Sequence, residues 1–143
     1  MKIIDIQNQL VEEFNELESW EEKYSKIIKF GRELSPMEDE LKTEKNIIEG
    51  CQSQVWMHAK FDNGKMYIAA DSDAMIVKGL IALLVKVYSG HEPNEIISSP
   101  PEFLKIMGID NHLSPIRKNG LGAMLKQIQL YAITFNALSV AKQ

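Results

Sequence analysis

Residues 55–70 read VWMHAKFDNGKMYIAA, and this stretch determines which kind of fold the chain can adopt. Apolar and polar residues alternate on both sides of Asn63-Gly64, the dipeptide most typical of a two-residue hairpin turn. With that turn, Phe61 opposes Met66, and one face of the hairpin becomes mostly apolar. The stretch therefore predicts two antiparallel strands with one buried face. The same register pairs Ala59 with Ile68 and Met57 with Ala70.

An isolated hairpin is only marginally stable, so these strands need a further strand or a cover of helices. Ile47-Ile48 stands just before the hairpin and is placed to supply a short third strand. After the hairpin, residues 74–88 are apolar on almost every side, which predicts a central helix capped by Asp71-Ser72-Asp73. Gly79 inside that helix costs about 1 kcal/mol relative to alanine, which indicates close packing against a neighbour.

Helical patterns also flank this central region. Apolar residues at spacings of three and four predict one helix over residues 3–17 and a second from Trp20 to a C-terminal cap at Gly31. Further helices are expected in three places: from Ser35-Pro36 to about Leu41, followed by a loop over 42–46; from Ser99-Pro100-Pro101 to just before Gly108; and from about Gly120 to the C-terminal region, after Ser114-Pro115.

The composition is that of one ordinary domain. The chain has 143 residues, of which 45% are hydrophobic and 25% charged, and its net charge is −4. Intrinsic disorder is therefore excluded, and an acidic balance argues against nucleic-acid binding or an anionic membrane surface. Together with the element order, this predicts a single α+β domain over residues 1–143, in which a small antiparallel sheet of about three strands packs against several helices.

No targeting segment is evident. Asp5 interrupts the apolar start of the chain, so no signal-peptide region forms. The longest apolar run, residues 79–85, is too short to cross a bilayer. We expect a cytoplasmic protein whose thiol is reduced and which does not associate with a membrane.

Cys51 is the single cysteine of the chain. One cysteine cannot form an internal disulfide, a cysteine-rich zinc site or an iron–sulfur cluster within one chain. A lone cysteine is most often a small buried hydrophobe. Here, however, Gly50 permits a tight turn, and Gln52 and Ser53 are polar, which favours a thiol in an accessible loop. Cys51 is therefore the candidate reactive residue.

Other chemistries have weaker support. The three histidines, His58, His91 and His112, have no metal-ligand spacing, and no protease signature surrounds Cys51. Gly120-Leu121-Gly122 lacks the features of a phosphate-binding loop. We expect neither a metal nor a cofactor on this chain.

Four blocks of the sequence form a set, of which the most specific is Gly50-Cys51-Gln52-Ser53-Gln54-Val55-Trp56. The other three are residues 20–24, residues 71–82 and residues 112–125. In their residues and their order, these blocks resemble the SufE family of sulfur-acceptor proteins, which includes CsdE. The chain departs from the usual family pattern at Ala70, Ile116 and Gly122.

The resemblance implies a fold shared with IscU-like scaffolds and a function in transferring sulfur. It implies that Cys51 accepts persulfide sulfur from a pyridoxal-phosphate cysteine desulfurase of the SufS or CsdA type and stimulates that enzyme. The sulfur would then pass to the SufB–SufC–SufD scaffold for iron–sulfur cluster assembly. This describes a sulfur-transfer partner rather than a stand-alone enzyme, with pyridoxal phosphate on the desulfurase. Whether the chain forms a homodimer is left open.

The chemistry of sulfur transfer suggests roles for the residues near Cys51. Transfer between two sulfurs needs an attacking thiolate and a leaving thiolate. We expect the resting thiol to lie among Ile48, Val55 and the start of the central helix, and to swing out to the desulfurase. The candidates for stabilising the anion or contacting the partner are Gly50, Gln52, Ser53, Asp73 and Arg117.

Three alternatives to the carrier stay open at this point. The first is a thiol-based redox sensor or regulator that uses Cys51. The second is an interaction module in which Cys51 is incidental packing. The third is a Cys–His hydrolase that pairs Cys51 with one of the histidines.

Overall fold

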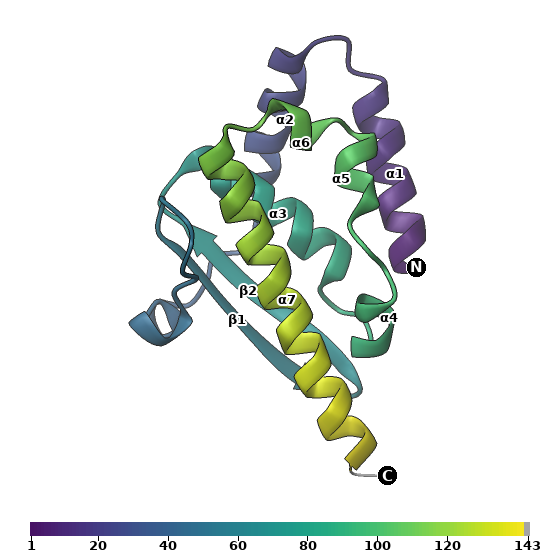
Figure 1. Ribbon diagram of the computed structural model, residues 1–143, viewed down its shortest axis with the longest axis vertical. Helices are drawn as coiled ribbons and strands as arrows, with labels where there is room; N and C mark the ends of the chain where they lie inside the picture. Colours follow the sequence, from purple (N-terminus) through teal and green to yellow (C-terminus); the bar gives the residue numbers. More distant parts are fainter. Residues whose placement is uncertain (142–143) are drawn as a thin grey trace.

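The computed structural model describes residues 1–141, and the predicted hairpin lies beside its central helix (Figure 1). Strand β1 (Val55–Asp62) pairs antiparallel with β2 (Lys65–Ser72). The turn residues Asn63 and Gly64 have φ of 52° and 81°, as a two-residue hairpin turn of this type requires. All three predicted residue pairings are confirmed: Phe61 with Met66, Ala59 with Ile68 and Met57 with Ala70.

The described residues form an α+β fold, as predicted, but the sheet has two strands instead of about three. Ile47 makes a single bridge to Trp56, and the amide of Ile48 donates to the carbonyl of Val55 at 2.9 Å. The chain then turns away at Gly50, where φ is +93°. The expected third strand is therefore reduced to one bridge, because the chain leaves the ladder to form the loop that carries Cys51.

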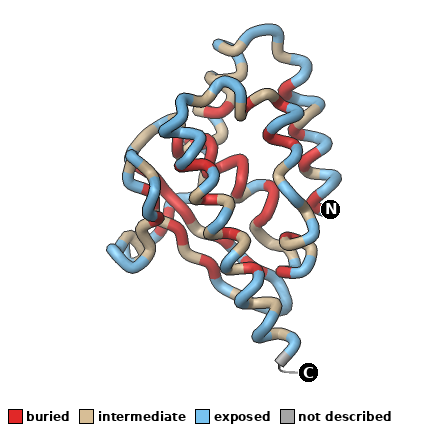
Figure 2. The backbone as a smooth tube through the Cα atoms, in the orientation of Figure 1, coloured by how far each residue is buried: buried red, intermediate tan, exposed pale blue. Residues whose placement is uncertain are grey.

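Helix α3 (Met75–Tyr88) is the centre of the core. It packs against β2 on one side and against α1 (Ile3–Asn15) and α2 (Trp20–Glu33) on the other. Many of the buried residues lie on α3 and on the strands beside it (Figure 2). An almost entirely apolar helix can be stable only in such a position, covered on several sides.

The crossing of α2 and α3 explains the glycine inside α3. A Cβ atom added at Gly79 would overlap the backbone carbonyl of Ile27, and one added at Gly31 would lie 2.8 Å from the amide nitrogen of Gly79. The close packing predicted for Gly79 is thus confirmed. The prediction that Gly31 caps α2 is wrong, because the helix continues to Glu33 and uses Gly31 for this contact.

The segment between α2 and the hairpin is less helical than expected. Ser35 and Pro36 do not begin a helix; the backbone is still extended at Glu38, and only the short 3-10 helices η1 (Asp39–Leu41) and η2 (Glu44–Asn46) follow. The predicted loop over 42–46 therefore contains one helical turn. Residues 35–46 are mostly polar, and so short a segment with so few apolar side chains cannot stabilise a full helix against the core.

The C-terminal half contains three short helices and one long one. The short ones are α5 (Glu102–Ile106), which was predicted, and α4 (Pro93–Ile97) and α6 (Ile109–His112), which were not. Helix α7 (Pro115–Ala141) begins five residues before the predicted start at Gly120, because Ser114 Oγ accepts the amide of Arg117 and Pro115 suits the first turn. It runs along the hairpin (Figure 1), where Tyr131 Oη donates to the carbonyl of Met57.

Candidate functional site

Cys51 lies in the loop of residues 49–53, which we call the Cys51 loop, between the bridge at Ile47 and the start of β1. Its side chain is partly buried and faces the N-terminal part of α7. Cys51 Sγ lies 3.6 Å from the carbonyl oxygen of Gly120, to which the thiol donates. A carbonyl acceptor suits the protonated thiol and not the thiolate.

A cavity of about 90 Å³ opens beside this thiol. One wall is the Cys51 loop itself, and the other two walls come from the early turns of α3 and α7. The lining is mainly apolar, with the guanidinium of Arg117 as its one cation among the described residues. The lining residues are Cys51, Gln52, Ser53, Val77, Leu80, Ile116, Arg117, Gly120 and Met124.

Burial raises the pKa of the Cys51 thiol above its ordinary value. At neutral pH the resting side chain is therefore a poor nucleophile, because the thiolate is the reactive form. The first turns of α3 and α7 both border the cavity, and the positive ends of their dipoles favour an anion there. The site thus holds a dormant thiol next to groups that can stabilise its charged form.

The chain downstream of Cys51 is fixed to the end of β2. The amide of Gln54 donates to Asp73 Oδ1 at 3.1 Å, and the carbonyl of Gln54 accepts from Ser72 Oγ at 2.8 Å. Ser72 Oγ also accepts the amide of Ala74, just before α3. The Asp71-Ser72-Asp73 stretch is thus mostly the end of the strand and an anchor for the Cys51 loop, not the helix cap that its composition suggested.

Comparison with known proteins identifies the family. The family model SufE, described as an Fe-S metabolism associated domain, matches residues 8–132. The chain belongs to the SufE family. Membership gives it a role in iron–sulfur metabolism, and it confirms the resemblance drawn from the Gly-Cys-Gln-Ser-Gln block.

Two curated relatives carry SufE-like names. SufE-like protein 1, chloroplastic/mitochondrial, of Arabidopsis thaliana is 40% identical over 126 residues, which cover 87% of this chain and 34% of the relative. An uncharacterized SufE-like protein of Synechocystis is 37% identical over 126 residues, covering 88% of this chain and 79% of the relative. The chain thus spans about a third of the Arabidopsis protein and most of the Synechocystis one.

A solved structure shares the fold. The solution structure of a hypothetical protein from Thermus thermophilus aligns with a TM-score of 0.76 at 24% identity, covering 90% of this chain and 94% of that one. The likeness supports the α+β SufE fold as a whole.

The structure brings most of the sequence-predicted SufE site residues together. Gln52, Ser53 and Arg117 line the cavity with Cys51, and Gly50 supplies the left-handed turn that precedes the thiol. Asp73 does not line the cavity; its carboxylate holds the amide of Gln54 instead. The start of α3 borders the thiol as expected, through Val77 and Leu80.

Apart from Arg117, the first turns of α7 form a part of the site that the sequence analysis did not predict. Ile48 and Val55 were expected around the thiol, but they belong to the core and do not line the cavity. The opposite wall is Ile116, Gly120 and Met124. The one sequence feature that could have pointed here is the glycine at residue 120, where a side chain would contact the sulfur. No spacing along the chain links Gly120 to Cys51.

The histidines lie elsewhere in the fold. His91 Nδ1 is 3.3 Å from Glu95, and His112 stacks on Trp20 at 3.6 Å between ring centroids. His58 borders a groove on the outer face of the hairpin. Residues 1–141 bring together no group of three His, Cys, Asp or Glu side chains suited to a metal ion. Within the same residues no helix is long and apolar enough to span a membrane.

Proposed function

We propose that this SufE-family chain is a sulfur carrier that accepts sulfur on Cys51 from a cysteine desulfurase of the SufS or CsdA type. The observation that carries the proposal is the single partly buried thiol beside a small, mostly apolar cavity. A carrier needs one thiol that is protected at rest and is activated by a partner, and the partial burial of Cys51 supports the first of these requirements.

The transfer step requires only sulfur chemistry. The Cys51 thiolate attacks the terminal sulfur of the persulfide on the desulfurase, and a new S–S bond forms at Cys51. The S–S bond on the desulfurase breaks, and its cysteine leaves as a thiolate. The proton lost by Cys51 goes to solvent or to the partner. Pyridoxal phosphate belongs to the desulfurase, and none is needed on this chain.

Activation must accompany docking, because burial holds the pKa of Cys51 above its ordinary value. When the Cys51 loop moves out of the cavity, the thiol loses the Gly120 carbonyl and regains solvent. Solvent and the partner then stabilise the anion, whereas Arg117 and the positive ends of α3 and α7 favour it only while the sulfur is still at the cavity. Docking therefore switches the thiol from protected to reactive, and emptying the desulfurase persulfide stimulates its turnover.

The cavity suits storage of the product. Its volume of about 90 Å³ exceeds the ~30 Å³ share of one water in the liquid, and one added sulfur is of similar size. An apolar wall keeps reductants away from the persulfide. We propose that the loaded protein carries this sulfur to the SufB–SufC–SufD scaffold.

The surface next to the cavity fits a protein partner. Met75 and Ile116, in the first turns of α3 and α7, are 59% and 52% exposed. Exposed apolar residues beside a reactive group are typical of interaction sites. A cytoplasmic location accords with a reduced thiol; since the Arabidopsis relative is named chloroplastic/mitochondrial, the compartment of this chain stays a prediction.

A redox sensor is less well supported by the site. Redox-sensing cysteines combine a lowered pKa with solvent access. Cys51 has a raised pKa and a partly buried side chain. The resting site therefore disfavours direct oxidation.

Stimulation of the desulfurase tests the proposal. A purified SufS-type or CsdA-type desulfurase is mixed with cysteine, and alanine release is followed with and without this protein. We expect the wild type to raise the rate of alanine release above that of the desulfurase alone, and Cys51→Ser to leave that rate unchanged. Equal stimulation by both would show that the effect does not pass through Cys51.

A further inference from the structure

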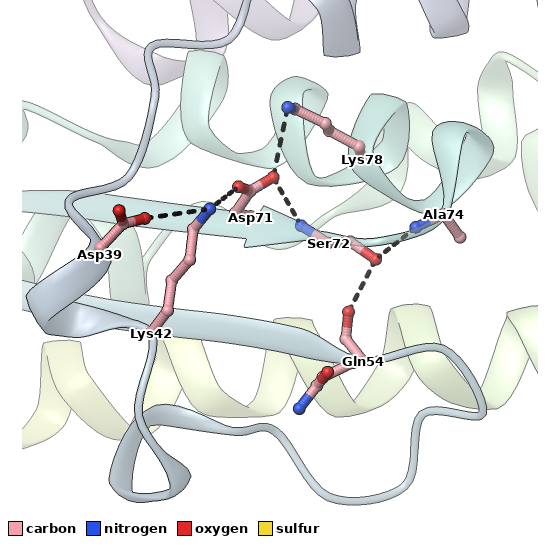
Figure 3. A network of polar contacts seen from close by, with 7 residues as sticks. All are labelled: Asp39, Lys42, Gln54, Asp71, Ser72, Ala74 and Lys78. Atoms are coloured by element: carbon pink, nitrogen blue, oxygen red, sulfur yellow. Dashed lines mark hydrogen bonds and ion pairs between the residues drawn. The ribbon is translucent and has the colours of Figure 1, made fainter.

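Both flanks of the Cys51 loop are fixed to one place, the β2–α3 corner formed by residues 71–74 (Figure 3). On the downstream side, Gln54 is held by Ser72 and Asp73 through the hydrogen bonds described above. On the upstream side, Lys42 reaches Asp71 with 2.8 Å between Nζ and Oδ2. The corner thus holds the loop directly on its downstream side and, through the Lys42 segment, on its upstream side, where Ile47 and Ile48 also pair with β1.

The Cys51 loop itself has little else to hold it. Among the hydrogen bonds of the described structure, residues 49–53 make one to the rest of the fold, from Cys51 Sγ to the Gly120 carbonyl. A thiol donor at 3.6 Å is weak. The resting position of the loop therefore depends on its fixed flanks and on packing in the cavity.

Asp71 is the centre of the polar network at the corner. Its side chain is 11% exposed, and it contacts two ammonium groups from different segments, Lys42 at 2.8 Å and Lys78 at 3.3 Å. Its Oδ1 also accepts the amide of Ser72 at 2.8 Å. One carboxylate thus links the segment before the Cys51 loop, the strand end that holds Gln54, and the central helix.

The electrostatics of this cluster depend on the Asp71 charge. Burial alone would raise the pKa of Asp71, but Lys42, the Ser72 amide and Lys78 outweigh it and lower the pKa. If the charge were removed, the ammonium groups of Lys42 and Lys78 would lose their shared counter-ion and would turn toward solvent, which both can reach. Asp39 would not replace it, since its side chain is fully exposed and 4.0 Å from Lys42.

We propose that Asp71 is a positioning residue for the Cys51 site, which holds both flanks of the loop so that the thiol rests in its cavity. Its significance for sulfur transfer rests on the proposed carrier function. Loss of Asp71 releases the Lys42 segment and loosens the strand end at Ser72. The Cys51 loop then leaves the cavity more often, and both the thiol and a persulfide on it become exposed to solvent.

Alkylation of Cys51 by iodoacetamide, followed by intact mass, measures this release without any partner protein. The test variant is Asp71→Asn, which keeps the size and one acceptor oxygen while it removes the charge. Asp39→Asn is the matched control, because it removes the exposed carboxylate beside the same lysine. Leu10→Ala, in the core on α1, is the control for lowered stability in general.

Denaturant dependence separates positioning from a loss of fold. If Cys51 is exposed by local opening of the loop, little surface is exposed with it, and the alkylation rate hardly changes with urea below the unfolding transition. If Cys51 is exposed by global unfolding, the alkylation rate rises steeply with urea. We expect Asp71→Asn to react at least about tenfold faster than the wild type, with a flat dependence below the unfolding transition. The alkylation rate of Asp39→Asn should equal that of the wild type. Any increase in the rate of Leu10→Ala should grow with the urea concentration.

Two results would overturn the positioning role: an unchanged rate in folded Asp71→Asn, or a gain as dependent on urea as that of Leu10→Ala. If Asp71→Asn does not fold, Lys42→Met takes its place. Lys42 is 29% exposed in its side chain, so its loss leaves the core intact, and the same flat but smaller gain is expected. Because no desulfurase is present, a negative result leaves the carrier function untouched, and a failed sulfur transfer leaves the alkylation result valid.

Discussion

Cys51 and Gly120 lie against each other across the cavity, with 3.6 Å between the sulfur and the glycine carbonyl oxygen. A Cβ atom added at Gly120 would stand 3.4 Å from that sulfur, which is ordinary van der Waals contact. An alanine at this place therefore fits, but anything larger enters the space of the thiol. The absence of a side chain larger than a methyl group at residue 120 leaves Cys51 the space in which it is sheltered.

A valine at residue 120 should expel the thiol. Its two methyl groups overfill the small cavity, and overpacking of this kind costs about 1–3 kcal/mol. We expect Gly120→Val to speed the alkylation of Cys51 by about fivefold or more, since that cost is relieved when the loop moves out. Gly122→Val is the control: it adds the same side chain to the same helix, where a Cβ meets nothing within 4 Å. Equal rates in the two variants would show that Gly120 does not limit the thiol.

The pH dependence of Cys51 alkylation should report its burial. Because burial raises the pKa of the thiol, the thiolate fraction at neutral pH is lower than for a free cysteine. The alkylation rate should rise with pH to a midpoint above that of the same cysteine in urea-unfolded protein. A midpoint equal to or below the unfolded value would mean that the resting thiol is already activated.

Asp71 should contribute stability that disappears in acid. Its pKa is lowered in the folded protein, so its contribution is fully present above the unfolded-state pKa of about 3.9 and is lost as pH falls through the lowered folded value. We expect Asp71→Asn to cost about 1–2 kcal/mol at pH 7, since its lysine partners are partly exposed to solvent. Urea unfolding of both proteins at pH 7 and pH 3 measures the difference, which should shrink at pH 3. A difference that is constant with pH would assign the effect to packing rather than to charge.

The crossing of α2 and α3 should not tolerate a methyl group. In an exposed helix, glycine to alanine stabilises by up to about 1 kcal/mol. At Gly79 the new Cβ would overlap the backbone of Ile27, so the helices must separate. We expect Gly79→Ala to lower the free energy of unfolding by about 2 kcal/mol, and Gly122→Ala, on the open side of α7, to raise it slightly. Denaturant unfolding of the two variants checks the opposite signs, and a stabilised Gly79→Ala would contradict the close crossing.

Local patterns were sufficient to predict the hairpin and the central helix. Asn63-Gly64 fixes both the turn and the register, because both residues must accept positive φ. The continuous apolar run over α3 indicates a helix covered on several sides, and Gly79 within it indicates a closely packed neighbouring helix. In each case a few adjacent residues carry the whole physical constraint.

The wrong predictions share a cause: tertiary contacts give a residue a different role from the one that its sequence neighbours suggest. Gly31 looks like a helix end, but it remains helical because the backbone of Gly79 needs the space. Asp71 looks like a helix cap, but it pairs with Trp56 in the hairpin and forms an ion pair with Lys42 from the segment before the Cys51 loop. Neither partner stands near Asp71 in the sequence.

The site shows the same division. Gly50 and Cys51 could be assigned from neighbouring residues, because a glycine turn and polar flanks mark a loop. Gly120, 69 residues away, could not, since its contact with the sulfur arises only when α7 packs along the hairpin. Sequence therefore predicts the reactive group, and the fold supplies its shelter.

The central claim is that Cys51 receives sulfur from a desulfurase, and intact mass tests it most directly. The protein is mixed with a SufS-type or CsdA-type desulfurase and cysteine, without reductant, and weighed beside Cys51→Ser. The account predicts an adduct of about 32 Da, one sulfur atom, on the wild type and none on the variant. An unchanged mass of the wild type, or an adduct that survives Cys51→Ser, would contradict it.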